Sequence, residues 1–229
     1  MDGLDFSVIG RSLGYLLGEG LVFSVTLTVI AALGGVVLGT LLALMRLSGN
    51  RWVSSAAGAY VNLIRAIPLL LVIFWFFFLV PFLGAWLLGA KEPVKVGAFW
   101  SSVITFTMFE AAYFAEIVRA GIRSVPAGQT QAGLALGLTQ RQVMSQIVLP
   151  QALRNMLPVL LSQVIVLFQD TSLVYVLSIT DFLGAATKIG QRDGRLVEMY
   201  LFVAAVYFFI CYLLSWQVRK LQVRTAIVR

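Results

Sequence analysis

Residues 131–150, QAGLALGLTQRQVMSQIVLP, decide the fold because they carry the signals of two short helices within an otherwise apolar chain. Residues 131–136 are rich in the helix formers Ala, Leu and Gln, and Gly137 is a natural residue for ending a helix. Thr139 and Gln142 have the spacing of a capping box, which opens a second helix. We therefore predict two short helices that meet at Gly137.

The two predicted helices lie in a loop, residues 124–154, between two long apolar segments. A connection of this length with helical signals of its own is uncommon unless it is functional. The second helix places Val143, Met144 and Ile147 on one side, and Pro150 follows within the same helical pattern. Because proline removes a backbone donor and clashes with the preceding turn, we expect Pro150 to kink or end this helix.

Outside this loop, the composition of the chain indicates a membrane protein. The chain has 229 residues, of which 60% are hydrophobic and 12% charged, and a soluble domain of this size cannot bury so much apolar surface. A helix of about 20 apolar residues crosses a bilayer. Five segments satisfy this requirement: 21–45, 60–83, 97–118, 157–179 and 199–217. We predict an all-α membrane protein with five transmembrane helices.

The segment 81–90 leaves six spans as the alternative. It is apolar but short and interrupted by glycine, so we interpret it as an interfacial or re-entrant piece. Pro68 and Pro81 flank the aromatic residues 74–78. We expect these two prolines to set the start and the end of the second span.

The distribution of Lys and Arg predicts the orientation. With the N-terminus outside, the cytosolic segments hold eleven basic residues: Arg46, Arg51, Arg65, Arg119, Arg123, Arg141, Arg154, Arg219, Lys220, Arg224 and Arg229. The outer segments hold six: Arg11, Lys91, Lys95, Lys188, Arg192 and Arg195. This excess follows the positive-inside rule. We therefore expect residues 1–19 to form an outer segment and 218–229 a basic cytosolic tail, and we expect the first span to be retained.

Several functional classes are disfavoured by what the sequence lacks. It contains no histidine and a single cysteine, Cys211, within an apolar run, so neither a metal site nor a disulfide framework is expected. The net charge of +7 does not indicate nucleic-acid binding, because the basic residues lie mostly at the ends of apolar runs. No G-x-x-x-x-G-K-[ST] sequence is present, so ATP hydrolysis has to come from another polypeptide.

The first span carries a stripe of small residues. Ala31, Gly35, Gly39 and Ala43 recur every four positions, which places them on one helix face and allows a second helix to approach closely. We favour packing within the chain, with a subunit interface as the alternative.

The spacing within 131–150 resembles the EAA loop of ABC importer permeases. That family pattern is Glu-Ala-Ala, three residues, Gly, nine residues, Ile, one residue, Leu and Pro. The matching positions here are Gln131, Ala132, Gly133, Gly137, Ile147, Leu149 and Pro150. The chain departs from the pattern at Gln131, which replaces the glutamate, and at Gly133, which replaces the second alanine. We therefore expect shape rather than charge to hold the ATPase subunit that this family's loop contacts at position 131.

The resemblance implies the type I ABC importer permease fold, with residues 20–217 as the transmembrane domain and 124–154 as the coupling loop. It implies that the first helix of this loop inserts into a cytosolic ATPase subunit, which binds ATP and Mg²⁺, and that this chain is a transport subunit rather than an enzyme. It further implies a second permease subunit, identical or a sister, an outer-face substrate-binding protein, and a location in the bacterial inner membrane.

Other segments are similar to permeases for polar amino acids. They are RAIPLL at 65–70, AAY at 111–113, AEIVR at 115–119 and QDTSL at 169–173. Together with MFE at 108–110 and QRDG at 191–194, the chain from about residue 15 to 217 resembles the membrane subunits of bacterial glutamate/aspartate importers. The resemblance implies an acidic amino acid as substrate. For 181–198 we give equal weight to two interpretations: a solvated loop and a contact for the binding protein.

Two carboxylates fall in the middle of predicted spans. Glu110 and Asp170, the latter followed by Thr171 and Ser172, would each cost about 2.5–3.5 kcal/mol to insert as bare charges. We hypothesise that one or both of these residues line the substrate path and hold the ammonium group of the amino acid, with a purely structural role as the alternative. Because unpaired acids would repel an acidic substrate, we expect them to pair with a cation, for which the partner subunit is a candidate source.

Glu116 and Arg119 lie three residues apart near the cytosolic end of the third span. This spacing allows them to pair on one helix face, and we interpret them as a structural ion pair.

Three rival classes remain. An ATP-independent secondary transporter or channel usually shows internal repeats with broken helices, and no second copy of the 131–150 pattern occurs. A membrane-embedded enzyme would have only Glu110, Asp170 and hydroxyl groups to work with. Only the coupling loop that contains 131–150 argues against a purely structural assembly subunit.

Overall fold

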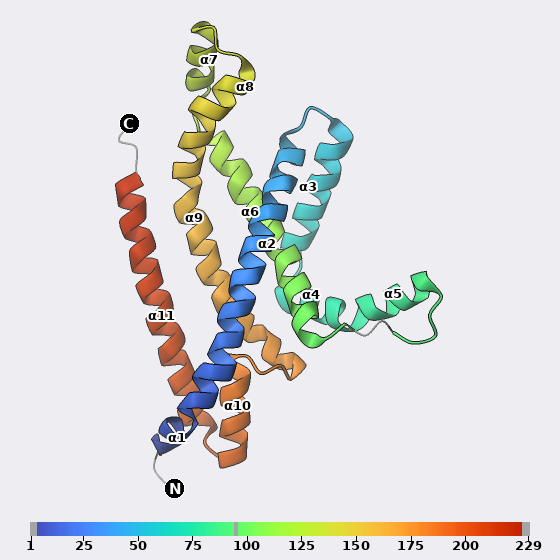
Figure 1. The fold of residues 1–229 in the computed structure, drawn as a ribbon, viewed down its shortest axis with the longest axis vertical. Coiled ribbons are helices and arrows are strands. Elements are labelled where there is room, and N and C mark those ends of the chain that lie inside the picture. The colour runs from blue at the N-terminus through green and yellow to red at the C-terminus, as the bar shows by residue number, and fades with distance from the viewer. Residues whose placement is uncertain (1–3, 94–95, 226–229) are drawn as a thin grey trace.

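The computed structural model describes residues 4–93 and 96–225, and nearly all of them are helical, with no strand among them (Figure 1). The helices are α1 (Ser7–Tyr15), η1 (Leu16–Leu21), α2 (Val22–Leu47), α3 (Arg51–Ala66), α4 (Leu69–Phe74), η2 (Trp75–Leu79), α5 (Val80–Leu88), α6 (Ala98–Arg123), α7 (Ala127–Ala135), α8 (Gln140–Gln142), η3 (Val143–Val148), α9 (Leu149–Asp170), η4 (Thr171–Leu177), α10 (Phe182–Asp193) and α11 (Leu196–Thr225).

Five helical segments among the described residues are long and apolar enough to cross a membrane. They are Ser7–Leu47, Leu69–Leu88, Ala98–Arg123, Gln140–Leu177 and Leu196–Arg224. The predicted all-α protein with five spans is therefore confirmed. The first helix starts well before residue 21 and the last continues past residue 217, so the predicted outer segment and tail are largely helical extensions of spans. Residues 1–3 and 226–229 lie outside the described part.

The predicted boundaries of the second span, 60–83, are wrong. Helix α3 ends at Ala66, and Ile67 has the extended backbone that a following proline favours. Pro68 caps the new helix, so it begins the span as expected, and the helix runs to Gly89, whose φ of 65° ends it. The segment 81–90 continues this helix as far as Leu88, and its interfacial position stays a prediction.

Two prolines were expected to break helices and do not. Pro81 lies in the first turn of α5 directly after the π-helical η2, and Pro150 lies in the first turn of α9 directly after the π-helical η3. A π turn widens the backbone spacing before the proline and so accommodates the missing donor and the ring. Each helix therefore continues across its proline. The helix that contains the fourth span begins at Gln140, within the 124–154 loop, and its α-helical part ends at Asp170, followed by the 3-10 turn η4.

The small-residue stripe of the first span packs inside the chain. Helices α2 and α6 run against each other, and Ala31, Gly35, Gly39 and Ala43 are all buried. A Cβ atom added at Gly39 would lie 2.7 Å from Phe114 Cβ and 2.8 Å from the Ala111 carbonyl oxygen. The expectation of internal packing is confirmed, because α6 occupies this face.

The long helices give the molecule two distinct ends (Figure 1). Helices α7 and α8 form one end, α1 and α10 lie at the other, and α5 projects sideways from the bundle. The two sequence features with functional signals, the 131–150 loop and the basic segment 181–198, are therefore at opposite ends.

Candidate functional site

The loop at 131–150 contains the short helix α7 and the start of a second helix that is longer than predicted, because it continues into α9, and the two are joined at Gly137. The φ of Gly137 is 82°, its N–H donates to the Leu134 carbonyl at 3.0 Å, and the Leu138 N–H donates to the Gly133 carbonyl at 3.2 Å. These two bonds form a Schellman motif, which satisfies the last carbonyls of α7. The predicted helix end at Gly137 is thus present in the structure.

The second helix begins with the predicted capping box. The Thr139 N–H donates to Gln142 Oε1 at 2.9 Å, and the Gln142 N–H donates to Thr139 Oγ1 at 3.3 Å. Helix α8 then continues through η3 into α9 without interruption, so the loop is mounted directly on the fourth span.

Gly133 allows α7 to lie close against this continuous helix. It is buried, and a Cβ atom there would lie 2.7 Å from Ile147 Cδ1 and 2.9 Å from Val143 Cγ2. The departure from the family's alanine therefore permits a closer contact between the two helices. The outer side of α7 is free: Gln131 and Ala132 are exposed, and Leu136 at its end is 81% exposed. Leu149 and Pro150 form the start of α9.

Glu110 and Asp170, the two predicted intramembrane acids, occupy different surroundings. Glu110 is fully buried in α6, and the Gln163 side-chain amide donates to its two carboxylate oxygens at 3.4 and 3.2 Å. Gln163 comes from α9, 53 positions away, so sequence reasoning could not pair these residues. Gln163 lines the neighbouring cavity, whereas Glu110 is not part of the lining.

Asp170 lines a cavity of about 400 Å³ between α3, α4, α6 and α9. Its lining also includes Arg65, Pro68, Phe109, Tyr113 and Gln163. The Arg65 guanidinium lies 5.3 Å from the centre of the Tyr113 ring. The lining of the cavity therefore includes a carboxylate and a cation, and the pairing of these acids with a cation stays a prediction.

Thr171 and Ser172 do not line this cavity. Thr171 is buried, and its hydroxyl donates to the Phe168 carbonyl at 2.7 Å, where α9 gives way to the 3-10 turn. This hydrogen bond caps the C-terminal end of α9.

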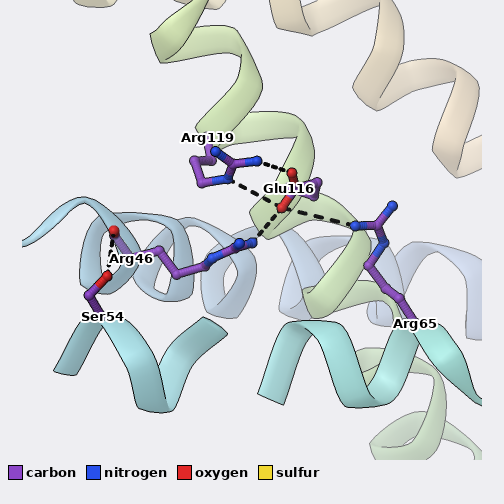
Figure 2. A network of polar contacts seen from close by, with 5 residues as sticks. All are labelled: Arg46, Ser54, Arg65, Glu116 and Arg119. Carbon is purple, nitrogen blue, oxygen red and sulfur yellow. Dashed lines mark hydrogen bonds and ion pairs between the residues drawn. The ribbon is translucent and has the colours of Figure 1, made fainter. Parts of the chain in front are cut away.

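Glu116 is the centre of a polar network near the α7 end of α6 (Figure 2). It forms ion pairs with Arg119 and Arg46, and Arg65 Nη1 lies 4.0 Å from its carboxylate. The Ser54 hydroxyl also donates to the Arg46 carbonyl at 2.9 Å. The network ties α2 and α3 to α6. The predicted Glu116–Arg119 pair is present, but the sequence analysis missed Arg46 and Arg65, which it had placed only on the same side of the membrane.

Arg65 is the most loosely held of the three arginines. Its side chain is 38% exposed, compared with 16% for Arg46 and 18% for Arg119. It is also the member of the network that borders the cavity.

Within the part of the chain that the structure describes, no three His, Cys, Asp or Glu side chains converge as a metal site would require. The cavity instead presents the carboxylate of Asp170 and the guanidinium of Arg65.

Comparisons with known proteins agree on one family. The family model described as "Binding-protein-dependent transport system inner membrane component" matches residues 35–227. The chain is 51% identical over 222 residues to the glutamate/aspartate import permease protein GltK of Escherichia coli O6:H1 (strain CFT073), covering 97% of this chain and 98% of that protein. It is 33% identical over 213 residues to the L-cystine transport system permease protein TcyB of Bacillus subtilis (strain 168), covering 93% and 87%.

Solved structures show the same fold. An amino acid ABC transporter crystallised with histidines is similar at a TM-score of 0.88 and 30% identity, covering 97% of this chain and 99% of that one. The MetNI methionine ABC transporter, in an inward-facing conformation, is similar at a TM-score of 0.74 and 19% identity, covering 93% and 97%. The second likeness concerns the fold alone.

Proposed function

Because the chain belongs to the ABC importer permeases, as a binding-protein-dependent transport system inner membrane component, we infer that it is the membrane subunit that carries glutamate or aspartate. The observation that carries this conclusion is the 51% identity to a glutamate/aspartate import permease over almost the whole of both chains. The chain is a transport subunit of a multi-pass membrane complex.

The work of the importer is divided among several subunits. A separate cytosolic ATPase binds ATP and Mg²⁺, a binding protein delivers the amino acid at the outer face, and a second permease subunit, identical or a sister, completes the pathway. Family membership supports these partners in general. The absence of a phosphate-binding G-x-x-x-x-G-K-[ST] sequence from the 229 residues supports a separate ATPase.

The coupling function falls to α7. Its exposed side, with Gln131, Ala132 and Leu136, faces the ATPase, while its buried Gly133 packs on η3. Because η3 and α9 form one continuous helix, a displacement of α7 moves the fourth span as a lever. Gln131 carries no charge, so shape complementarity rather than an ion pair holds the ATPase at this position.

The amino acid is held in the cavity between α3, α4, α6 and α9. Asp170 accepts from the ammonium group and Arg65 donates to a carboxylate, an arrangement that matches the opposite charges of the substrate backbone. Glu110 does not contact the cavity itself. It accepts a hydrogen bond from the Gln163 amide, which lines the cavity, and so holds that amide in place. The presence of Arg65 resolves the repulsion that two unpaired acids would exert on an acidic substrate.

The orientation places the N-terminus outside and the C-terminus in the cytosol of a bacterial cell, with 20–217 as the membrane domain. The excess of basic residues in the segments that include the 131–150 loop supports it. So does the separation of α7 and α1 to opposite ends of the molecule (Figure 1).

The substrate is tested by ATPase stimulation of the assembled complex in nanodiscs. Binding protein loaded in turn with glutamate, aspartate, glutamine or arginine is titrated against the complex. We expect glutamate and aspartate to stimulate ATP hydrolysis most strongly. Stimulation by glutamine or arginine but not by the two acids would overturn the substrate assignment and leave the permease assignment in place.

A further inference from the structure

An apolar groove lies between α9 and α11, which pack against each other (Figure 1). It has a volume of about 350 Å³. Its lining consists of Leu161, Val164 and Ile165 from α9 and of Leu214, Val218 and Leu221 from α11, with Gln217 as the polar member. None of these residues belongs to the cavity that contains Asp170 or to the network around Glu116.

The groove lies on the side of α9 that faces away from the cavity. Gln163, Val166 and Asp170 of α9 line the cavity. At about 3.6 residues per turn, the middle of this set lies about 180° around the helix axis from the α9 residues that line the groove. In the proposed function the second permease subunit completes the pathway at the cavity, so the groove faces the lipid.

The groove is closed at one end and open along its side. Toward the α10 end, α9 and α11 are joined by a cluster of the buried residues Ile165, Phe168 and Cys211. Leu161 and Leu214, by contrast, are exposed. Because the interior of a bilayer contains no water, hydrocarbon has to cover this exposed apolar wall.

Two arginines lie beyond the other end of the groove, one on each helix. Arg154 precedes Leu161 of the lining by seven residues. Arg224 follows Leu221 of the lining by three residues. Residues with these spacings lie on one helix face, and at 1.5 Å per residue the arginines are roughly 10 and 5 Å beyond the two leucines. Both arginine side chains are exposed.

The end of α11 that carries Arg224 lies at the cytosolic edge of the bilayer in the proposed orientation. The Lys220 ammonium lies 3.4 Å from the centre of the Trp216 ring, and Trp216 is exposed. Exposed tryptophan and flanking basic residues are typical of the boundary between hydrocarbon and headgroups. Leu221 is therefore close to this boundary, and Arg224 reaches the level of the lipid phosphates.

The charges of these two arginines are not balanced by acids of the cytosolic segments. No Asp or Glu occurs in residues 120–169 or 199–229. Glu116, near the same end of α6, forms ion pairs with other arginines. Within the described residues, neither Arg154 nor Arg224 forms an ion pair. The cytosolic end of the groove is therefore positively charged.

We propose that this groove is a binding site for an anionic phospholipid of the cytosolic leaflet. One acyl chain lies against the apolar walls, and the phosphate accepts hydrogen bonds from Arg154 and Arg224, because guanidinium groups match the geometry of phosphate oxygens. A zwitterionic lipid would bring an ammonium group toward the same two cations and is disfavoured. The inference rests on the proposed function for the orientation of the chain and for the side on which the second permease subunit lies.

The test uses the assembled importer in detergent and compares two lipids with the same oleoyl chains, phosphatidylglycerol and phosphatidylcholine. Native mass spectrometry gives the dissociation constant of the first bound lipid. The variant combines Arg154→Gln and Arg224→Gln. The matched control combines Arg123→Gln and Arg219→Gln, which removes the same charge from exposed arginines outside the groove lining. A phosphatidylglycerol with a photoreactive acyl chain then identifies the residues that the chain contacts.

We expect the variant to bind phosphatidylglycerol about tenfold more weakly than the control, with phosphatidylcholine binding weak and unchanged in both. The photoreactive chain should label residues 161–165 or 214–221. Equal binding of phosphatidylglycerol to variant and control, or labelling only outside these ranges, would overturn the proposal. A photoreactive amino acid placed at position 214 that cross-links to the second permease subunit would also overturn it.

Lipid binding is measured without substrate, so an error in the assigned substrate leaves these results unaffected. Failure of the wild-type chain to assemble with an ATPase subunit would refute the proposed function rather than the lipid site.

Discussion

Arg65 joins the two polar regions of the membrane domain. It lines the cavity that contains Asp170, and it lies 4.0 Å from Glu116, which already has two closer arginine partners. Removal of Arg65 therefore leaves Glu116 paired, whereas it leaves the cavity without its cation.

We expect the single substitutions Asp170→Asn and Arg65→Gln to reduce glutamate uptake. Each removes one charge-assisted hydrogen bond to the substrate, which corresponds to a loss of about tenfold or more in apparent affinity. Uptake into proteoliposomes as a function of loaded binding protein and substrate measures the effect. Ser172→Ala, at a position outside the cavity lining, is the control. Normal uptake with unchanged preference in both variants would refute a role for this cavity.

The contact at Gly39 gives a second prediction for single residues. A methyl group there would meet the Ala111 carbonyl oxygen at 2.8 Å and the Ala115 nitrogen at 2.9 Å, and backbone atoms cannot move aside as a flexible side chain does. We expect Gly39→Ala to lower the stability of the purified complex by about 1–3 kcal/mol, measured as a fall in thermal unfolding temperature.

Gly14→Ala is the matched control, because no atom lies within 4 Å of the added methyl group in the same long helix. It should be neutral or slightly stabilising. A Gly39→Ala protein as stable as this control would show that α2 and α6 do not pack as closely as described.

Sequence reasoning identified individual acids but not their partners. Glu110 and Asp170 were identified because a carboxylate within an apolar helix is costly wherever that helix packs. The contacts of Gln163 with Glu110, and of Arg46 and Arg65 with Glu116, depend on the relative rotation of separate helices. A single sequence contains no direct signal for that rotation.

Among the helical elements, the two prolines at 81 and 150 show where local rules fail. Each is compatible with a continuous helix because a π turn precedes it, and the insertion of one residue in a turn leaves no mark in the hydrophobic pattern. Pro68 does begin a new helix, because Ile67 before it has extended backbone. By contrast, the cap at Thr139 and the stop at Gly137 were predictable, because these signals are local in sequence.

The joint at Gly137 gives a prediction for the coupling element. Its φ of 82° disfavours residues with a side chain, so Gly137→Ala should cost about 1–2 kcal/mol locally, while Gly137→Asn is tolerated. Gly137→Pro fixes φ near −65° and removes the N–H that donates to Leu134. We expect the number of substrate molecules carried per ATP hydrolysed to fall in the order Asn, Ala, Pro.

Gly128→Ala in the same helix is the control for this series, since no atom lies within 4 Å of the added methyl group. ATP-driven transport that survives intact in Gly137→Pro would contradict the role of this joint in coupling.

For the whole molecule, composition and periodicity were sufficient for the number of spans and the membrane environment. The spacing within 131–150 was sufficient for the family. The position of the cavity could not be predicted, because it is formed by segments that are distant in sequence. Arg65 and Asp170, for example, share one cavity only because α3 and α9 both pack against α6.

We propose that this chain carries an acidic amino acid only as part of an ATP-driven importer. The decisive measurement is uptake of radiolabelled glutamate into proteoliposomes that contain the chain, its ATPase and a second permease subunit, with a binding protein added. We expect uptake that requires ATP, the ATPase and the binding protein together and is competed by aspartate. Glutamate uptake by the chain without the ATPase, driven by an ion gradient, would contradict it.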